Sequence, residues 1–162
     1  MNKRAAGRGM VVALLAVLGA VRVDAQAVSL LTRPAWAQVP AGVRVLKIKV
    51  RRLGAPVGGP VTVAAPARVR RIVREVNRLP VWQMANVPVA CPADVGPLVQ
   101  VAFFRRRGDA VPAAVATADG SGCGTVALEV HGRTAPSLTG GPAVIAALES
   151  AAPRLRGLIQ TS

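Results

Sequence analysis

One segment of the chain has a clear helical period, and it constrains the fold more than any other feature of the sequence. Between Pro66 and Leu79, apolar residues fall on one stripe at 3.6-residue spacing, with arginines covering the other side. The stripe consists of Val69, Ile72, Val73, Val76 and Leu79. Pro66 suits the first helical position and Pro80 ends the helix, although Ala65 stands where a polar cap is preferred. The segment is therefore predicted to be an amphipathic helix that packs by one side.

Segments with a period of two residues predict strands before and after this helix. Apolar residues alternate with lysine and arginine over residues 46–51, and a turn rich in glycine and proline over 53–60 leads to a short strand at 61–63. These two strands are expected to pair as a hairpin. Further strands are expected at 98–104 and 125–131, where alternate residues are apolar.

Two weaker segments complete the predicted fold. A strand over residues 111–118 contains Pro112, which favours a position at the edge of the sheet. Apolar spacing over residues 142–152 indicates a second helix. The order β-β-α-β-β-β-α predicts an α+β fold, in which an antiparallel sheet of about five strands carries the helices on one face. The opposite face is expected to be partly solvated and basic.

The N-terminus has the parts of a secretory signal peptide. Basic residues precede an apolar run from residue 10 to 21, and Ala25-Gln26-Ala27 offers a small-residue cleavage site. Because this run is shorter than the ~20 residues that span a bilayer, we expect cleavage after Ala25 or Ala27 and export, rather than retention as an anchor. Residues 1–27 are then a signal peptide, 28–42 a flexible tether, 43–152 a single domain and 153–162 a C-terminal tail.

The chain is strongly basic. Of its 162 residues, 21 are Lys or Arg and 7 are Asp or Glu, which gives a formal net charge of +14. An exported cation meets anionic wall polymers and lipid headgroups before it meets DNA, so we expect partners of the first kind and no nucleic acid. The candidate anion-binding face consists of Arg70, Arg71, Arg74 and Arg78 on the helix and Arg105, Arg106 and Arg107 in a turn. The alternative is that these arginines are only the solvated side of the domain.

Residues for catalysis or metal binding are scarce. His131 is the only histidine and no Cys-x-x-Cys pair is present, so neither a metal site nor a cofactor is expected. A Ser-His-Asp triad would combine His131 with Ser121 or Ser137 and with Asp94, Asp109 or Asp119. These aspartates have the pattern of turn residues, and His131 falls at an outward position at the end of a strand. We therefore expect that the protein is not an enzyme.

The two cysteines, Cys91 and Cys123, bound a segment of 33 residues. In an exported chain such a pair forms a disulfide more often than two free thiols. Closing the loop would stabilise the fold by ~3–4 kcal/mol in the chain-entropy description. Free or redox-active thiols and metal ligation are the alternatives, and the shortage of other ligands weighs against metal.

Three short motifs resemble those of a family of small exported bacterial proteins. They are Asn77-Arg78-Leu79-Pro80, Cys91-Pro92-Ala93-Asp94-Val95-Gly96 and Gly122-Cys123. The resemblance covers roughly residues 43–131 and departs from the family at Ala65, where a polar cap is usual, and at Val95, where an aromatic residue is common. It implies the same disulfide and the same fold, and it implies no mechanism.

Two functions from different classes are consistent with these features. The first is an exported, non-enzymatic domain that associates with anionic surfaces of the cell envelope. The alternative is a secreted inhibitor or protein-binding module that presents a rigid loop to a protein partner, an analogy that rests on the fold class alone. Dependence of binding on salt separates the two, because only the first relies mainly on exposed charges.

Overall fold

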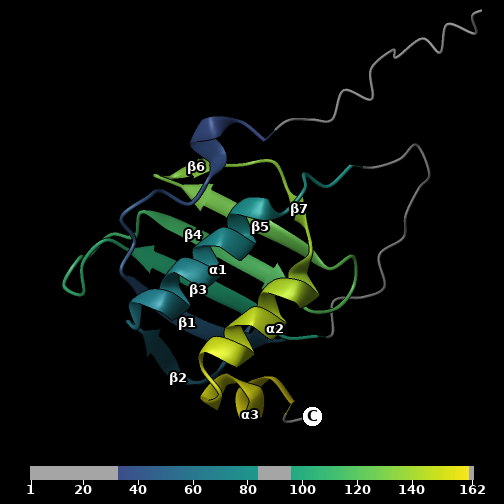
Figure 1. Cartoon of the computed structure of the whole chain (residues 1–162). Helices are drawn as coiled ribbons and strands as arrows, with labels where there is room; N and C mark the ends of the chain where they lie inside the picture. Colours follow the sequence, from purple (N-terminus) through teal and green to yellow (C-terminus); the bar gives the residue numbers. More distant parts are fainter. Residues whose placement is uncertain (1–32, 84–95, 161–162) are drawn as a thin grey trace, which may run out of the picture. The chain divides into compact units, whose positions relative to one another are not determined.

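Antiparallel pairing joins seven strands into one sheet, and helices cover one of its faces (Figure 1). The computed structural model describes residues 33–83 and 96–160. Within these ranges the strands are β1 Val45–Arg52, β2 Ala55–Val63, β3 Leu98–Phe104, β4 Ala114–Asp119, β5 Thr125–Val130, β6 Arg133–Thr134 and β7 Leu138–Thr139. The helices are α1 Pro66–Arg78, α2 Gly141–Ala151 and α3 Arg154–Gln160, with a short 3₁₀ turn at Ala35–Ala37.

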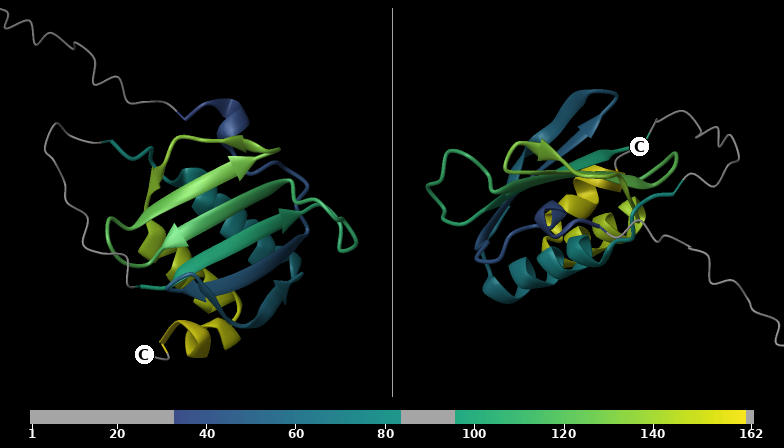
Figure 2. Two further views of the ribbon diagram at one scale, coloured as in Figure 1. Left: turned by 180° about the vertical axis from the view of Figure 1, so that it is seen from behind. Right: turned by 90° about the horizontal axis from the view of Figure 1, so that it is seen from above.

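The sheet order is β2-β1-β3-β4-β5-β6, and β7 also pairs with β5. Seen from above, the sheet and the helices form two layers, and the view from behind looks onto the sheet with α1 and α2 beyond it (Figure 2). The predicted α+β class and antiparallel sheet are confirmed. The sheet has more strands than expected because β6 and β7, of two residues each, are too short to show a period.

Alternate residues along the central strands face the helices and form the core. The rows between β1 and β3 join Leu46 with Phe103, Ile48 with Val101 and Val50 with Val99, all of them buried. The helix α1 adds Val69, Ile72 and Val76 from its predicted stripe. On the other face of β1, Lys49 and Arg51 are exposed and Lys47 lies over the ring of Phe104, with Nζ 4.5 Å from its centroid. The predicted periods of both element types are therefore confirmed.

The strand predicted over residues 111–118 does not lie at the edge of the sheet. Strand β4 begins at Ala114, after the proline, and pairs with β3 on one side and β5 on the other. Pro112 therefore removes no hydrogen bond from the ladder. The prediction of an edge position was wrong because the proline belongs to the preceding loop.

One edge of the sheet is formed by β2, which is longer than predicted. The β1–β2 hairpin turns at Leu53-Gly54, and residues 55–60 are strand rather than turn. Glycine and proline are tolerated there because only one side of an edge strand needs a ladder. Gly58 has a further role, since a Cβ at this position would lie 2.8 Å from Cδ2 of Leu158 in α3.

Residues 33–42, which were predicted to be part of a flexible tether, pack on the domain. The side chain of Asn77 accepts a hydrogen bond from Val39 N at 2.8 Å and donates one to Val39 O at 3.0 Å. Arg33 donates to Ala37 O and, at 2.7 Å, to Val76 O near the end of α1, where a cation suits the helix dipole. Burial lowers the pKa of Arg33 from its ordinary value. The segment lacks a period because side-chain bonds to its backbone hold it in place.

The predicted C-terminal tail is also ordered over most of its length. Residues 154–160 form α3, and its Leu155 is fully buried. This helix has only seven residues and follows Pro153, so the sequence shows no clear helical period there. The second predicted helix is confirmed as α2, with Val144, Ile145 and Leu148 buried.

Candidate functional site

The arginines of α1 do not form one uniform face. All of Arg70, Arg71, Arg74 and Arg78 are exposed, but Arg71 Nη1 donates to Ser150 Oγ of α2 at 3.2 Å. The neighbouring Arg68 likewise donates to Ala151 O at 3.0 Å. These two side chains join α1 to α2, whereas Arg70 lies on the side of α1 that faces the start of β1. The predicted face is therefore divided between structural and freely exposed arginines.

A cleft of about 680 Å³ joins one helix arginine of the predicted face to the three arginines of the turn. Its lining includes Arg70 from α1 and Arg105, Arg106 and Arg107 from the β3–β4 loop, and it adds Arg44, which precedes β1. Its remaining lining is apolar or small, namely Gly42, Val43, Val45, Ala64 and Pro66. Arginines from three separate segments of the sequence thus surround one hollow.

The sheet register explains why these segments meet. Strands β1 and β3 are antiparallel with Val45 opposite Phe104, so the start of β1 lies beside the end of β3. Arg44 N donates to Phe104 O at 2.9 Å and fixes this corner. Strand β2 ends at the same side of the sheet and leads through Ala64 into α1. The cleft therefore lies at the end of the sheet where β1, β2 and β3 meet.

The β3–β4 loop is closed by its own turn. The carboxylate of Asp109 accepts a hydrogen bond from Arg106 N at 2.9 Å, and Asp109 N donates to Arg106 O at 3.4 Å. This confirms the prediction that Asp109 is a turn residue. The turn leaves the side chains of Arg105, Arg106 and Arg107 exposed.

Both the side chains that line the cleft and the N-terminus of α1 make it electropositive. No acidic residue is among those that line it, and none of its five arginine side chains makes a hydrogen bond or ion pair with another described residue. Helix α1 begins at its rim with Pro66, and Ala65 supplies no side-chain cap, so the positive end of the helix dipole faces solvent there. In α2, by contrast, Gly141 N is bonded to Gly124 O.

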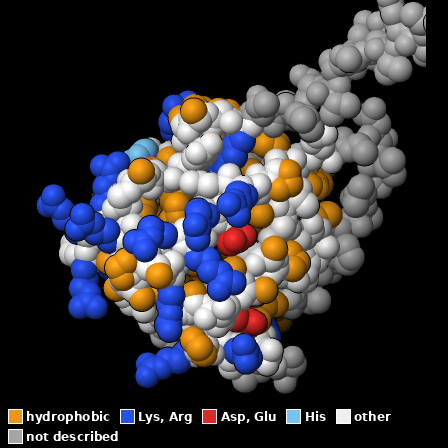
Figure 3. Space-filling view, in the orientation of Figure 1, with side chains coloured by type: hydrophobic (Ala, Val, Ile, Leu, Met, Phe, Trp, Pro, Cys, Tyr) orange, Lys and Arg blue, Asp and Glu red, His pale blue; other side chains and the backbone are white. Residues whose placement is uncertain are grey.

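The helix side of the molecule shows the same imbalance of charge. Lys and Arg side chains spread over the centre and left of this view, and only two small acidic areas interrupt them (Figure 3). Apolar side chains lie between the cationic ones. A ligand that matches this surface carries several negative charges and tolerates apolar neighbours.

The candidate catalytic residues are not brought together. Ser121 lies before the start of β5 and His131 just after its end, and a strand of this length separates them by ~20 Å. Asp119 Oδ1 accepts hydrogen bonds from Ser121 N at 2.9 Å and Ser121 Oγ at 3.1 Å, which is turn chemistry. Ser137 precedes Leu138, which pairs with Val126 near the start of β5 and not with the end where His131 lies. Asp94 falls outside the described residues. In the described part of the chain, no cluster of acidic, histidine or cysteine side chains could hold a metal ion.

Comparisons with known proteins do not assign a function. No protein-family model matches the chain. No curated protein and no solved structure matches it either. None of the helices over residues 33–83 and 96–160 is long and apolar enough to cross a membrane. The cleft is therefore the feature from which a function can be argued.

The contribution of Arg44 could not be predicted from the sequence. It falls immediately before the alternating segment and has no charged neighbour within three positions other than Lys47. Its place in the cleft depends on the β1–β3 register, which is a tertiary contact. The grouping of Arg70 with Arg105, Arg106 and Arg107, by contrast, follows the charge pattern that was predicted.

Proposed function

We propose that this protein is an exported, non-enzymatic domain that binds phosphate-bearing surfaces of the cell envelope through the arginine cleft. The observation that carries the proposal is the set of five arginines from three segments around one hollow without an acidic residue. Exposed like charges repel one another, so their collection in one place has an energetic cost that a bound polyanion would offset.

Phosphate is the anion that this site fits best. Guanidinium groups form two parallel hydrogen bonds with a phosphate and are less strongly hydrated than lysine ammonium groups. The uncapped N-terminus of α1 at the rim of the cleft adds backbone donors. The apolar lining, which includes Val43, Val45 and Pro66, suits the glycerol or acyl part that adjoins the phosphate in envelope components.

Export and the disulfide belong to the same proposal. Residues 1–27, which carry the signal-peptide pattern, and Cys91 fall outside the described residues, so both features stay predictions. Gly96 N donates to Ser121 Oγ at 3.1 Å, which holds the chain five residues after Cys91 against the chain two residues before Cys123. This contact is compatible with the proposed pairing, because the separation of five residues between Gly96 and Cys91 can span up to ~18 Å.

Binding to vesicles tests the function and its dependence on salt. The mature protein is expected to sediment with vesicles of phosphatidylglycerol and phosphatidylcholine and to remain in solution with phosphatidylcholine alone. Bound protein should fall steeply between low and physiological salt, because exposed charges are screened beyond ~8–10 Å.

A second arm identifies the source of the phosphate. Soluble poly(glycerol phosphate) at matched phosphate concentration should release the protein from the vesicles if the headgroup chemistry is what it recognises, whereas failure to compete assigns the site to lipid. Equal sedimentation with both kinds of vesicle, or binding that salt does not change, would contradict the proposal.

A further inference from the structure

We propose that the open edge of β2 binds an extended, acidic peptide segment of another protein as an added strand. This surface adjoins the arginine cleft at Ala64, but the proposal does not depend on the cleft. Strand β2 is the outermost strand of the sheet beside β1. Helix α3 covers its first part, where Leu158 packs on Gly58. From Pro60 to Ala65 the chain lines a groove of about 380 Å³.

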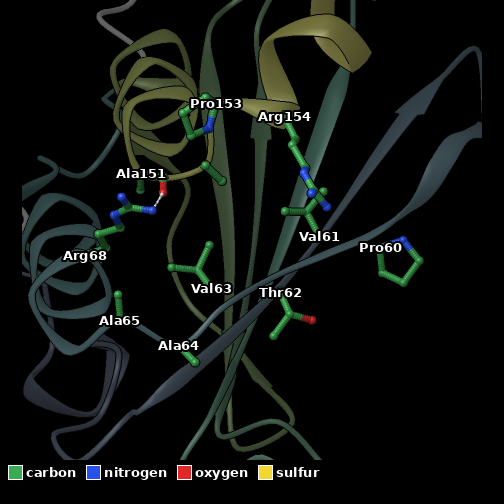
Figure 4. Close-up of a pocket in the computed structure, with 11 residues that line it drawn as sticks. Pro60, Val61, Thr62, Val63, Ala64, Ala65, Arg68, Ala151, Pro153 and Arg154 are labelled. Atoms are coloured by element: carbon green, nitrogen blue, oxygen red, sulfur yellow. Dashed lines mark hydrogen bonds between the residues drawn. The ribbon is translucent and has the colours of Figure 1, made fainter.

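The groove is lined by β2 on one side and by the residues between α2 and α3 on the other. Its lining runs along β2 and then crosses to the corner between α2 and α3, from Ala151 to Arg154 (Figure 4). Val61 is half-buried and Thr62 is exposed. An extended chain laid along β2 would therefore pass between the strand and this corner.

The register identifies which backbone groups are available. Successive residues of a strand direct their N–H and C=O groups alternately to its two sides. Ala113 N donates to Phe103 O, so Phe103 faces β4 and its neighbour Ala102 faces β1. Ala102 lies opposite Lys47, so the backbone of Lys47 faces β3 and those of its two neighbours face β2.

The same alternation continues into β2. Lys47 has Leu46 and Ile48 as its neighbours in β1, and they lie opposite Val63 and Val61 of β2. The backbone groups of Val61 and Val63 are therefore bonded within the sheet. Thr62 N–H and C=O then point to the open edge. No hydrogen bond to them from outside the β1 ladder occurs among the described residues. An added strand would bond to Thr62, which is how peptides are recognised at sheet edges.

The positive charge of the groove favours an acidic peptide. The guanidinium groups of Arg68 and Arg154 line the groove, and no acidic residue does. Arg68 is held in place by its bond to Ala151 O, drawn as a dashed line in Figure 4. A second copy of this chain would bring two such pairs of arginines together, which like-charge repulsion disfavours. Pro60, which has no N–H, limits the usable edge to a few residues.

A peptide titration tests this proposal. The probe is acetyl-Glu-Val-Thr-Val-Glu-amide, and the control peptide has lysine in place of both glutamates. The acidic peptide should shift the backbone amide resonance of Thr62 saturably, and the basic peptide should not. Thr62→Pro should weaken binding at least tenfold, whereas Thr62→Val, which keeps the N–H, should bind as the unchanged protein does.

A second pair of variants keeps the test valid if Thr62→Pro disturbs the fold. Arg154→Gln should weaken binding several-fold, while Arg156→Gln, on the same helix but outside the groove, should not. Equal binding of both peptides would overturn the proposal. So would acidic-peptide binding that neither Thr62→Pro nor Arg154→Gln weakens, or resonance shifts confined to residues 105–107, which would assign the peptide to the cleft.

Discussion

Replacing Cys123 by serine is expected to lower the free energy of unfolding by ~3–4 kcal/mol. The proposed disulfide to Cys91 closes a loop of 33 residues, and opening it restores conformational entropy to the unfolded chain. The contact between Gly96 and Ser121 is too small to hold the ends of this loop together by itself, because one hydrogen bond contributes only ~1 kcal/mol. Urea denaturation of the oxidised protein and the variant measures the difference.

Reduction provides the matched control for this variant. The unchanged protein treated with a thiol reductant should lose the same stability as Cys123→Ser, and the reductant should not destabilise the variant further. If two thiols titrate in denaturant without any reductant, the disulfide does not exist and the predicted loss has no cause.

Replacing Leu155 by alanine is expected to cost ~2–5 kcal/mol, although the residue belongs to the last helix of the chain. Leu155 is fully buried in α3, and Leu155 N is bonded to Ala152 O at 2.9 Å. Truncation would leave a cavity where α3 packs beside α2 and β2. Denaturation with urea measures the loss as a lower midpoint with an unchanged slope.

The control is Arg156→Ala, one position further along the same helix. Arg156 is exposed, and substitutions of exposed side chains change stability by no more than ~0.5 kcal/mol. If Leu155→Ala changes stability as little as Arg156→Ala does, α3 does not belong to the core, and residues 153–162 behave as the tail that the sequence predicts.

The helices and strands that could be predicted are those in which the spacing of apolar residues matches the spacing of buried ones. The stripe of α1 and the alternation of β1 and β5 are direct consequences of one side facing the core, so the sequence alone was sufficient. The position of β4 could not be read in this way. Its inward residues are Ala114, Ala116 and Ala118, which are small because α2 lies close to this strand, and small residues give a weak periodic signal.

The order of residues 33–42 could not be predicted from hydrophobic spacing for a different reason. Residues 33–42 are held by Asn77 and Arg33 through bonds to backbone atoms, and such bonds leave no trace in the hydrophobic pattern. In the sequence, Asn77 stands out only as part of the motif that resembles an exported family. The structure gives this asparagine a physical role, since its amide both donates to and accepts from Val39.

The candidate site was predicted in part for a similar reason. Net charge and charge spacing identify arginines that are exposed, but they do not show which of them lie together. Arg71 belongs to the contact between α1 and α2, and Arg44 joins the cleft through the β1–β3 register. Only the tertiary structure shows which arginines line one cleft and which lie on a solvated helix face.

Comparison of two charge-matched double variants tests the cleft most directly. Arg70→Gln with Arg106→Gln removes two charges from the cleft, and Arg74→Gln with Arg78→Gln removes two from exposed positions of α1 outside it. The measured quantity is the affinity for phosphatidylglycerol vesicles at fixed salt. The first pair is expected to lower it by about tenfold or more, since hydrogen bonds to charged groups are worth ~1.5–3 kcal/mol each, and the second pair by a few-fold at most. Equal losses for the two pairs would show that net charge alone attracts the protein and would contradict a binding site in the cleft.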